Sequence, residues 1–259
     1  MTQPFDPMAV LASVDLLTDL DTYTSTADKA YDNLLRYHNV TSYSQLSLLH
    51  RCPRKFQLAK YKAADSQRAS FDLPNLDFCF GHAVGAGSQN YLLSKNITTA
   101  LFNAMMAWRA DLTARWDKKK KSLWEAIIAV EKFAEWGALE DWELLILPNG
   151  KPAIELSFSL HAANGYKHYG HVDIVLKNIY SGKLAILELK TEGGEEPEEA
   201  KYANSSQAVG YGVCLDAIFP GLTDYTVLYA VYSASSRKWN LLPFDKTMLH
   251  KAEWVKDLL

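Results

Sequence analysis

Two acidic residues and a lysine stand in neighbouring segments that alternate in the manner of β-strands. Over residues 169–176, a period of two places Asp173 on the more polar face. Over residues 184–190, the same period places Glu188 and Lys190 together, opposite an apolar face. The pattern therefore predicts a polar patch that draws side chains from both strands.

The turn between the two segments decides which of these side chains meet. Ser181 and Gly182 have the character of a two-residue hairpin loop. With that loop, Asp173 lies opposite Lys190 and diagonally from Glu188. Two carboxylates so close repel each other unless a cation lies between them, and Mg²⁺ and Mn²⁺ prefer oxygen ligands. The alternative is a cross-strand salt bridge beside an exposed glutamate, and the spacing alone leaves both interpretations open.

The composition describes the molecule that must position these groups. The chain has 259 residues, 48% hydrophobic and 22% charged, which is typical of a globular protein with a sizeable core. A formal charge of −3 excludes a protein coated in positive charge, although two basic blocks favour a polyanionic partner. We find no signal peptide, no apolar run of about 20 residues and no paired cysteine spacing. We therefore expect a soluble cytoplasmic protein.

The hydrophobic patterning predicts one α+β (or α/β) domain over residues 41–259, preceded by an acidic extension, helical or partly ordered, over residues 1–40. Asp245 could cap a final helix. Helices are expected at 44–61 with a kink or a break into two short helices at Pro53, at 82–147 as a helical insertion, and at 198–218. Strands are expected at 154–160, 169–176, 184–190, 225–232 and 239–244.

Asp173, followed by Glu188-Leu-Lys190-Thr191, resembles the motif of the PD-(D/E)xK nucleases, and most closely that of their RecB-type exonuclease branch. Further segments between residues 42 and 232 are similar to motifs of that branch, in the same order. They are Ser42-Tyr-Ser-Gln-Leu46 with Cys52-Pro-Arg-Lys-Phe56, Phe80-Gly81, Gly170-His-Val-Asp173 and Gln207-Ala-Val-Gly-Tyr211. The resemblance implies a restriction-endonuclease-like core, in which a central mixed sheet in αβββαβ order is flanked by helices.

The resemblance also implies a role for each matching residue. Asp173, Glu188 and the backbone carbonyl of Leu189 would hold Mg²⁺ or Mn²⁺. Lys190 would orient or deprotonate the attacking water and offset charge at the scissile phosphate. Glu155, on the polar face of the preceding strand, would support the site.

Contacts to DNA are expected from two other places. Gln207 and Tyr211 are four residues apart on one helix face, so both can point at the same strand of DNA. The alternative for Tyr211 is an aromatic residue of the core. Arg54 and Lys55 are candidate phosphate contacts. The lysine run at 118–121 is expected to be solvated surface.

The sequence departs from the branch at three points. The cluster of cysteines that holds an iron–sulfur cluster in some relatives is missing, so we expect no iron–sulfur cluster, with Cys52 as a small core residue. Position 85 is Gly where the branch has a histidine ligand. His82 and Gln89 lie within one turn of it; His82 is a candidate supporting residue, and we expect neither to bind the metal directly. No helicase-type phosphate loop is present, so an ATP-driven motor would be a separate chain.

The function that the resemblance implies is a metal-dependent deoxyribonuclease, an exonuclease of DNA recombination or resection. Small stand-alone members of this branch are frequent in bacteriophages, so the chain would act in a bacterial host cell. Its partners would be DNA and, as separate proteins, a recombinase, a single-strand annealing protein or a helicase. Two alternatives stay open. They are a structure-specific or restriction-like endonuclease and a catalytically weak DNA-binding module on the same fold.

Overall fold

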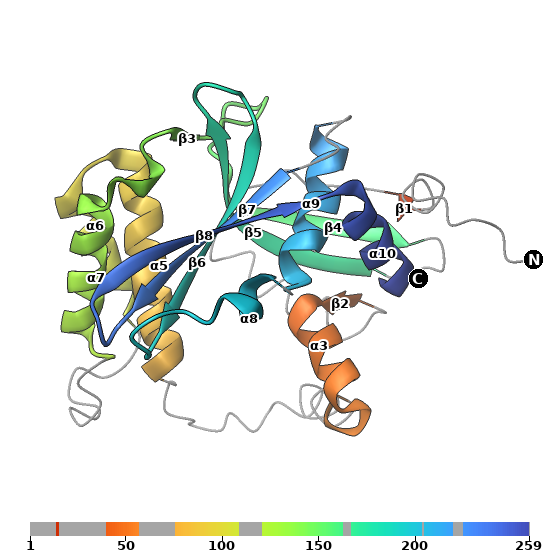
Figure 1. Cartoon of the computed structure of the whole chain (residues 1–259), viewed down its shortest axis with the longest axis horizontal. Helices are drawn as coiled ribbons and strands as arrows, with labels where there is room; N and C mark the ends of the chain where they lie inside the picture. Colours follow the sequence, from red (N-terminus) through yellow and green to blue (C-terminus); the bar gives the residue numbers. More distant parts are fainter. Residues whose placement is uncertain are drawn as a thin grey trace, which may run out of the picture.

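The structure is a computed structural model, and it describes residues 14–15, 40–56, 76–108, 121–162, 167–203, 205–219 and 225–258 (Figure 1). Within these ranges, no helix is both long enough and apolar enough to cross a lipid bilayer. Most of the predicted acidic extension, the end of the first predicted helix at 57–61 and most of the lysine run at 118–121 lie outside the described residues.

The described strands form one mixed sheet. Its main path runs β1-β4-β5-β6-β7-β8, with β2 and β3 paired to opposite ends of β5. Two of the pairings, β2 with β5 and β6 with β7, are parallel. The strands are β1 (Val14–Asp15), β2 (Val40–Ser42), β3 (Trp142–Leu144), β4 (Ile154–Ala162), β5 (Lys167–Asn178), β6 (Leu184–Glu192), β7 (Tyr225–Ser233) and β8 (Lys238–Lys246).

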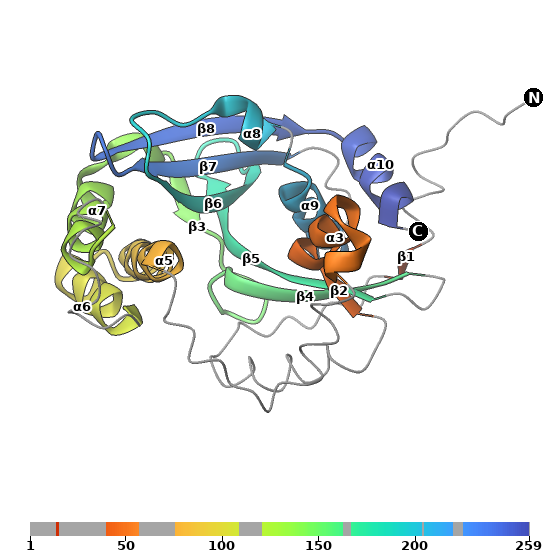
Figure 2. The same cartoon turned by 90° about the horizontal axis from the view of Figure 1, so that it is seen from below.

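Helices cover both faces of this curled sheet (Figure 2). One core joins the sheet to α9 and α10 through residues such as Tyr211, Leu215 and Val255. A second core joins it to α5 and α7 through Phe80, Val84 and Phe133. The helices are α3 (Tyr43–Arg51), α5 (Leu76–Ser94), α6 (Ile97–Ala107), α7 (Leu123–Glu135), α8 (Glu199–Ala203), α9 (Gln207–Ile218) and α10 (Met248–Leu258).

The interruption predicted at Pro53 is confirmed, and it takes the form of two short helical segments. Ser42 begins α3 with a capping box, in which its hydroxyl accepts from the Gln45 N–H and the Gln45 side chain accepts from the Ser42 N–H. The helix ends at Arg51, and a short helical turn resumes over 53–56. Proline lacks the N–H that an uninterrupted helix needs, but it suits the first position of a new turn. Cys52 is the partly exposed residue between the two helical segments, so its prediction as a core residue is wrong.

Long-range strand pairing overrides the local pattern in two places. Residues 82–147 are not helical throughout, because Trp142–Leu144 forms β3 and pairs with the far end of β5. The pairing of β4 with β5 stops at Ile174, so the end of β5 has an open edge that β3 occupies. In the extension, Val14–Asp15 is likewise a strand, paired with β4.

Two further predictions about helices need correction. The helix expected over 198–218 is broken between α8 and α9. Asp245 does not cap the last helix, since it lies in β8. There its carboxylate accepts from the Thr226 hydroxyl at 2.7 Å and from the Lys183 ammonium at 3.0 Å.

Candidate active site

The centre of the site is a fork in the sheet, where β5 and β6 part. Their last paired residues are Ile174 and Leu187, so Asp173 and Glu188 are the next residues across the fork. Beyond it, β6 stays paired with β7, and β5 with β4 and β2. The Leu189 N–H donates to Asp173 Oδ2 at 3.4 Å, which places an acidic side chain where the ladder has ended.

The predicted register of this hairpin is wrong by two residues. Lys177 pairs with Leu184, and the turn residues between them are held by Asn178, whose side-chain oxygen accepts from the Ser181 N–H at 2.9 Å. This turn is longer than the predicted two-residue loop because the Asn178 side chain folds it back on itself. Asp173 therefore aligns with Glu188 rather than with Lys190.

Lys190 completes the group, with its ammonium nitrogen 2.7 Å from Glu188 Oε2. Burial raises the pKa of Asp173, and burial together with the charge of Asp173 raises the pKa of Glu188. Burial opposes the charge of Lys190, but the carboxylates of Glu188 and Asp173 outweigh it and raise the pKa of Lys190. The fork thus gathers two carboxyl groups that disfavour ionisation together and one ammonium group that stays charged.

The period-two alternation fails at the fork. Val172 packs in the core under α9, whereas Ile174 packs in the core under α5, although the alternation predicts one face for both. On β4, Glu155 faces the same break, since it lies between the partners of Val172 and Ile174, and its φ is +48°. A left-handed residue turns the strand, so the faces exchange on either side of it.

Glu155 is tied to the helix that passes the fork. Gln89 of α5 donates from Nε2 to Glu155 Oε1 at 2.6 Å. One turn earlier, a Cβ on Gly85 would meet no atom of the described residues within 4 Å, and two turns earlier, one on Gly81 would approach the Thr191 hydroxyl at 3.5 Å. Among the described residues, the position where the resembled branch has a histidine is therefore open.

His82 does not take that place. It is exposed on α5, and its ring stacks on Phe78 with the ring centres 6.1 Å apart and the planes 5° apart. Arg54 and Lys55 are exposed in the helical turn after α3, a position that suits phosphate contacts. Those contacts remain a prediction.

On the α9 side, the structure places Tyr211 in the core. Its ring packs edge-on against Phe158 at 5.7 Å between centres, and its hydroxyl accepts from Gln207 Nε2 at 2.5 Å. Burial first, and then the charges of Glu188 and Asp173, raise the pKa of Tyr211, so its hydroxyl lies near the fork. Tyr211 is thus a core aromatic residue at the site, and its contact with DNA remains a prediction.

The sequence did not single out Tyr229 as part of the site. It lies beside Glu188 in the parallel ladder of β6 and β7, and its side chain is buried. Burial, with smaller effects that include the charge of Glu188, raises the pKa of Tyr229 to about 12. In the sequence this tyrosine is one of several apolar residues in a buried strand, and only the ladder register marks it.

The fork residues fit a divalent cation. Glu188 Oε1 is buried and receives no hydrogen bond from the described part of the chain. The N–H and carbonyl of a strand residue point to the same side, so the Leu189 carbonyl points toward Asp173 as its N–H does. Among the described residues, no three His, Cys, Asp or Glu side chains are arranged to hold a metal. Mg²⁺ accepts such a site because it keeps several water ligands.

The chain was compared with known proteins in three ways. No protein-family model matches it, and no curated protein matches it. A solved structure described as "Crystal structure of SSO0001" aligns with 79% of this chain and 84% of its own, at 11% identity and a TM-score of 0.29.

Proposed function

We propose that this protein is a divalent-metal-dependent DNA nuclease, of the exonuclease type that serves DNA recombination or end resection. The observation that carries the proposal is the pair Asp173 and Glu188, held together at the fork with Lys190 beside them. A buried acidic pair is costly unless something compensates its charge, and a cation at a phosphodiester is a chemical reason to retain it. On this proposal, the sheet with its flanking helices is a restriction-endonuclease-like core, and the helices before β4 are an insertion in it.

Each residue of the fork has a task in this chemistry. Asp173, Glu188 and the Leu189 carbonyl oxygen would hold the cation. Once bound, the cation would polarise the phosphate and lower the pKa of a coordinated water. The Lys190 side chain is 32% exposed, and its ammonium group would offset negative charge on the phosphate and help orient the water. Glu155, whose carboxylate accepts a hydrogen bond from Gln89, would add negative charge beside the fork and hold water there.

The experiment incubates linear and circular DNA with Mg²⁺ or Mn²⁺. Loss of linear DNA alone identifies an exonuclease, and loss of both forms identifies an endonuclease. Asp173→Asn and Glu188→Gln should abolish cleavage while the circular dichroism spectrum and DNA binding remain. Asp141→Asn, an exposed carboxylate outside the fork, is the matched control and should cleave at the wild-type rate. Unchanged cleavage by either fork variant would refute the assignment.

One observation favours a second candidate function, a DNA-binding module with weak or no turnover. The open space beside Gly85 leaves the fork without the nitrogen ligand of the resembled branch. Binding of DNA without loss of either form would support this second function. The same space makes Gly85→His a direct test, because a gain of cleavage in that variant would show that the missing ligand limits the rate.

A further inference from the structure

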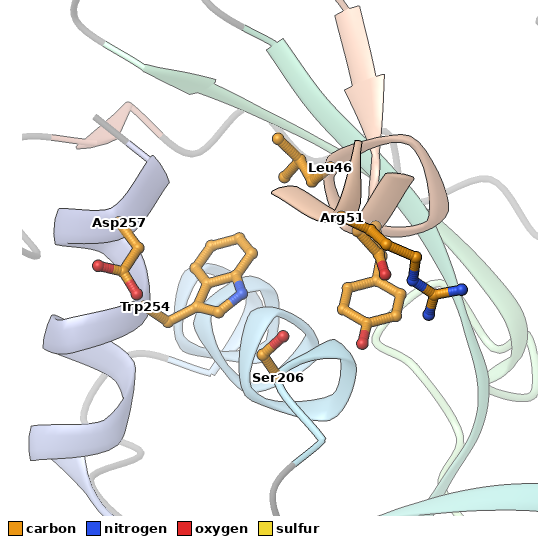
Figure 3. Close-up of a pocket in the computed structure, with 7 residues that line it drawn as sticks. Leu46, Arg51, Ser206, Trp254 and Asp257 are labelled. Carbon is orange, nitrogen blue, oxygen red and sulfur yellow. The ribbon is translucent and has the colours of Figure 1, made fainter. Parts of the chain in front are cut away.

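A pocket of about 440 Å³ lies between α3, the start of α9 and the end of α10 (Figure 3). This volume is in the range of pockets that hold small organic ligands. We call it the α3–α10 pocket. It is lined by Tyr43, Leu46, Ser47, Arg51, Ser206, Trp254 and Asp257.

The α3–α10 pocket has opposite charges at its two sides. Figure 3 shows Arg51 on the α3 side and Asp257 on the α10 side, with Trp254 and Ser206 between them. Both charged residues belong to the described part of the chain, and no ion pair joins them there. A ligand with an anionic group at one end and hydrogen-bond donors at the other would complement these charges.

The wall between the charges is aromatic and rigid. Trp254 packs edge-on against His168 with ring centres 5.2 Å apart. Its ring also lies so close to Gly210 that a Cβ there would sit 2.6 Å from the indole. Trp254 is thus fixed before any ligand arrives, and Tyr43 adds a second aromatic ring to the lining. A flat, partly apolar ligand group suits such a wall, as nucleobases do when they stack on protein aromatic rings.

The pocket and the fork share the first turns of α9. Ser206 immediately precedes α9, and Tyr211, whose hydroxyl lies near the carboxylates, follows five residues later. Five helical residues span roughly 7.5 Å, which is on the scale of one nucleotide unit. Gln207, the residue after Ser206, donates from Nε2 to the Tyr211 hydroxyl at 2.5 Å and so links the two places.

We propose that the α3–α10 pocket binds one unstacked nucleotide of a single DNA strand. The phosphate lies toward Arg51, the base lies against Trp254, and the donor groups of the base face Asp257. The Ser206 hydroxyl makes no capping bond to α9 and can donate to the phosphate. The inference rests on the proposed nuclease function and specifies its substrate as DNA that reaches the fork in single-stranded form.

The test measures binding in EDTA, so that hydrolysis does not contribute. A short labelled oligothymidine is compared with an abasic strand of the same length by fluorescence anisotropy. The wild type should bind the oligothymidine at least about fivefold more tightly, since stacking on an aromatic side chain is sequence-tolerant and favourable. Tyr43→Ala should reduce that preference, because it removes the second aromatic ring of the lining while Trp254 remains. Arg51→Ala should weaken both strands about tenfold, because it removes a phosphate contact.

Lys132→Ala, which removes one exposed charge on α7, is the matched control and should bind both strands as the wild type does. Equal wild-type affinity for the two strands, or wild-type binding by Arg51→Ala, would overturn the pocket assignment. Trp254 is left intact because its packing against α9 serves the fold. The binding and cleavage assays test the two proposals separately. Absence of cleavage with an intact preference for the base-containing strand would refute only the proposed nuclease function. Cleavage without that preference would refute only the proposed nucleotide pocket.

Discussion

A buried histidine should make this protein sensitive to mild acid. His168 of β5 is 3% exposed, and its Nδ1 has no hydrogen-bond partner among the described residues. Burial lowers the pKa of His168 from 6.5 to about 4. Between these values the unfolded chain binds a proton that the folded protein excludes, so the free energy of unfolding falls as the pH is lowered through this window.

The size of the effect follows from the two pKa values. At pH 5, the unfolded histidine is almost fully protonated and the folded one is mostly neutral, which costs about 2 kcal/mol. Below pH 4 the cost levels off at about 3 kcal/mol, because the folded protein then binds the proton as well. A loss of this size is a large part of the stability of an ordinary domain.

The assay is urea unfolding at pH 7 and at pH 5, with the wild type and His168→Phe. Phenylalanine keeps a ring between Phe158 and Trp254 but cannot titrate. The difference in free energy between the two proteins should shift by about 2 kcal/mol in favour of the variant at pH 5. Leu249→Ala, which replaces an exposed side chain on α10 that cannot titrate, is the control and should show no such shift. The same wild-type-to-variant difference at both pH values would refute the reasoning.

Four further predictions concern the site and its surroundings. Lys190→Ala should slow DNA hydrolysis at least ~10²-fold, and a near-normal rate would mean that the lysine is only an ion-pair partner. Mg²⁺ should support DNA cleavage about as well as Mn²⁺, and His82→Ala should change the cleavage rate only slightly. A strict Mn²⁺ requirement together with an inactive His82→Ala variant would show that His82 is a metal ligand. Anaerobically purified protein should be colourless, and a brown, iron-loaded preparation would contradict the absence of an iron–sulfur cluster. Gly170→Ala should lower the free energy of unfolding in urea titrations by about 1–3 kcal/mol, because its Cβ would lie 2.7 Å from Phe158 Cζ. Gly85→Ala, whose Cβ would meet no atom of the described residues within 4 Å, is the control and should not lower the free energy of unfolding.

The strands could be predicted from local patterns of apolar residues. Residues 154–160 and 184–190 alternate and residues 225–232 form an apolar run, and all three segments fall inside observed strands. Pro53 likewise fixed the end of the first helix through its own covalent structure. Each of these predictions depends on a local property of the chain, which is why each succeeded.

The features that were missed depend on contacts between distant segments. Trp142–Leu144 is a strand because it pairs with the end of β5 that β4 leaves unpaired. The three residues themselves carry no sequence signal of that pairing. The exchange of faces at Asp173 depends on the left-handed backbone of Glu155, a residue type that rarely adopts it. The grouping of Asp173, Glu188 and Lys190 was nevertheless predicted, since a two-residue error in register keeps every side chain on its face.

The turn between β5 and β6 has a consequence for how the chain can evolve. It lies on the surface, where insertions and deletions are usually harmless. The Asn178 N–H donates to the Lys183 carbonyl oxygen at 2.9 Å, and this pair sets the alignment of Asp173 with Glu188. Residues can therefore be lost or gained between Asn178 and Lys183 without a shift of β6 along β5, and the parallel ladder of β6 with β7 opposes such a shift from the other edge. The alignment of the two carboxylates is thus insulated from changes in the length of this exposed turn.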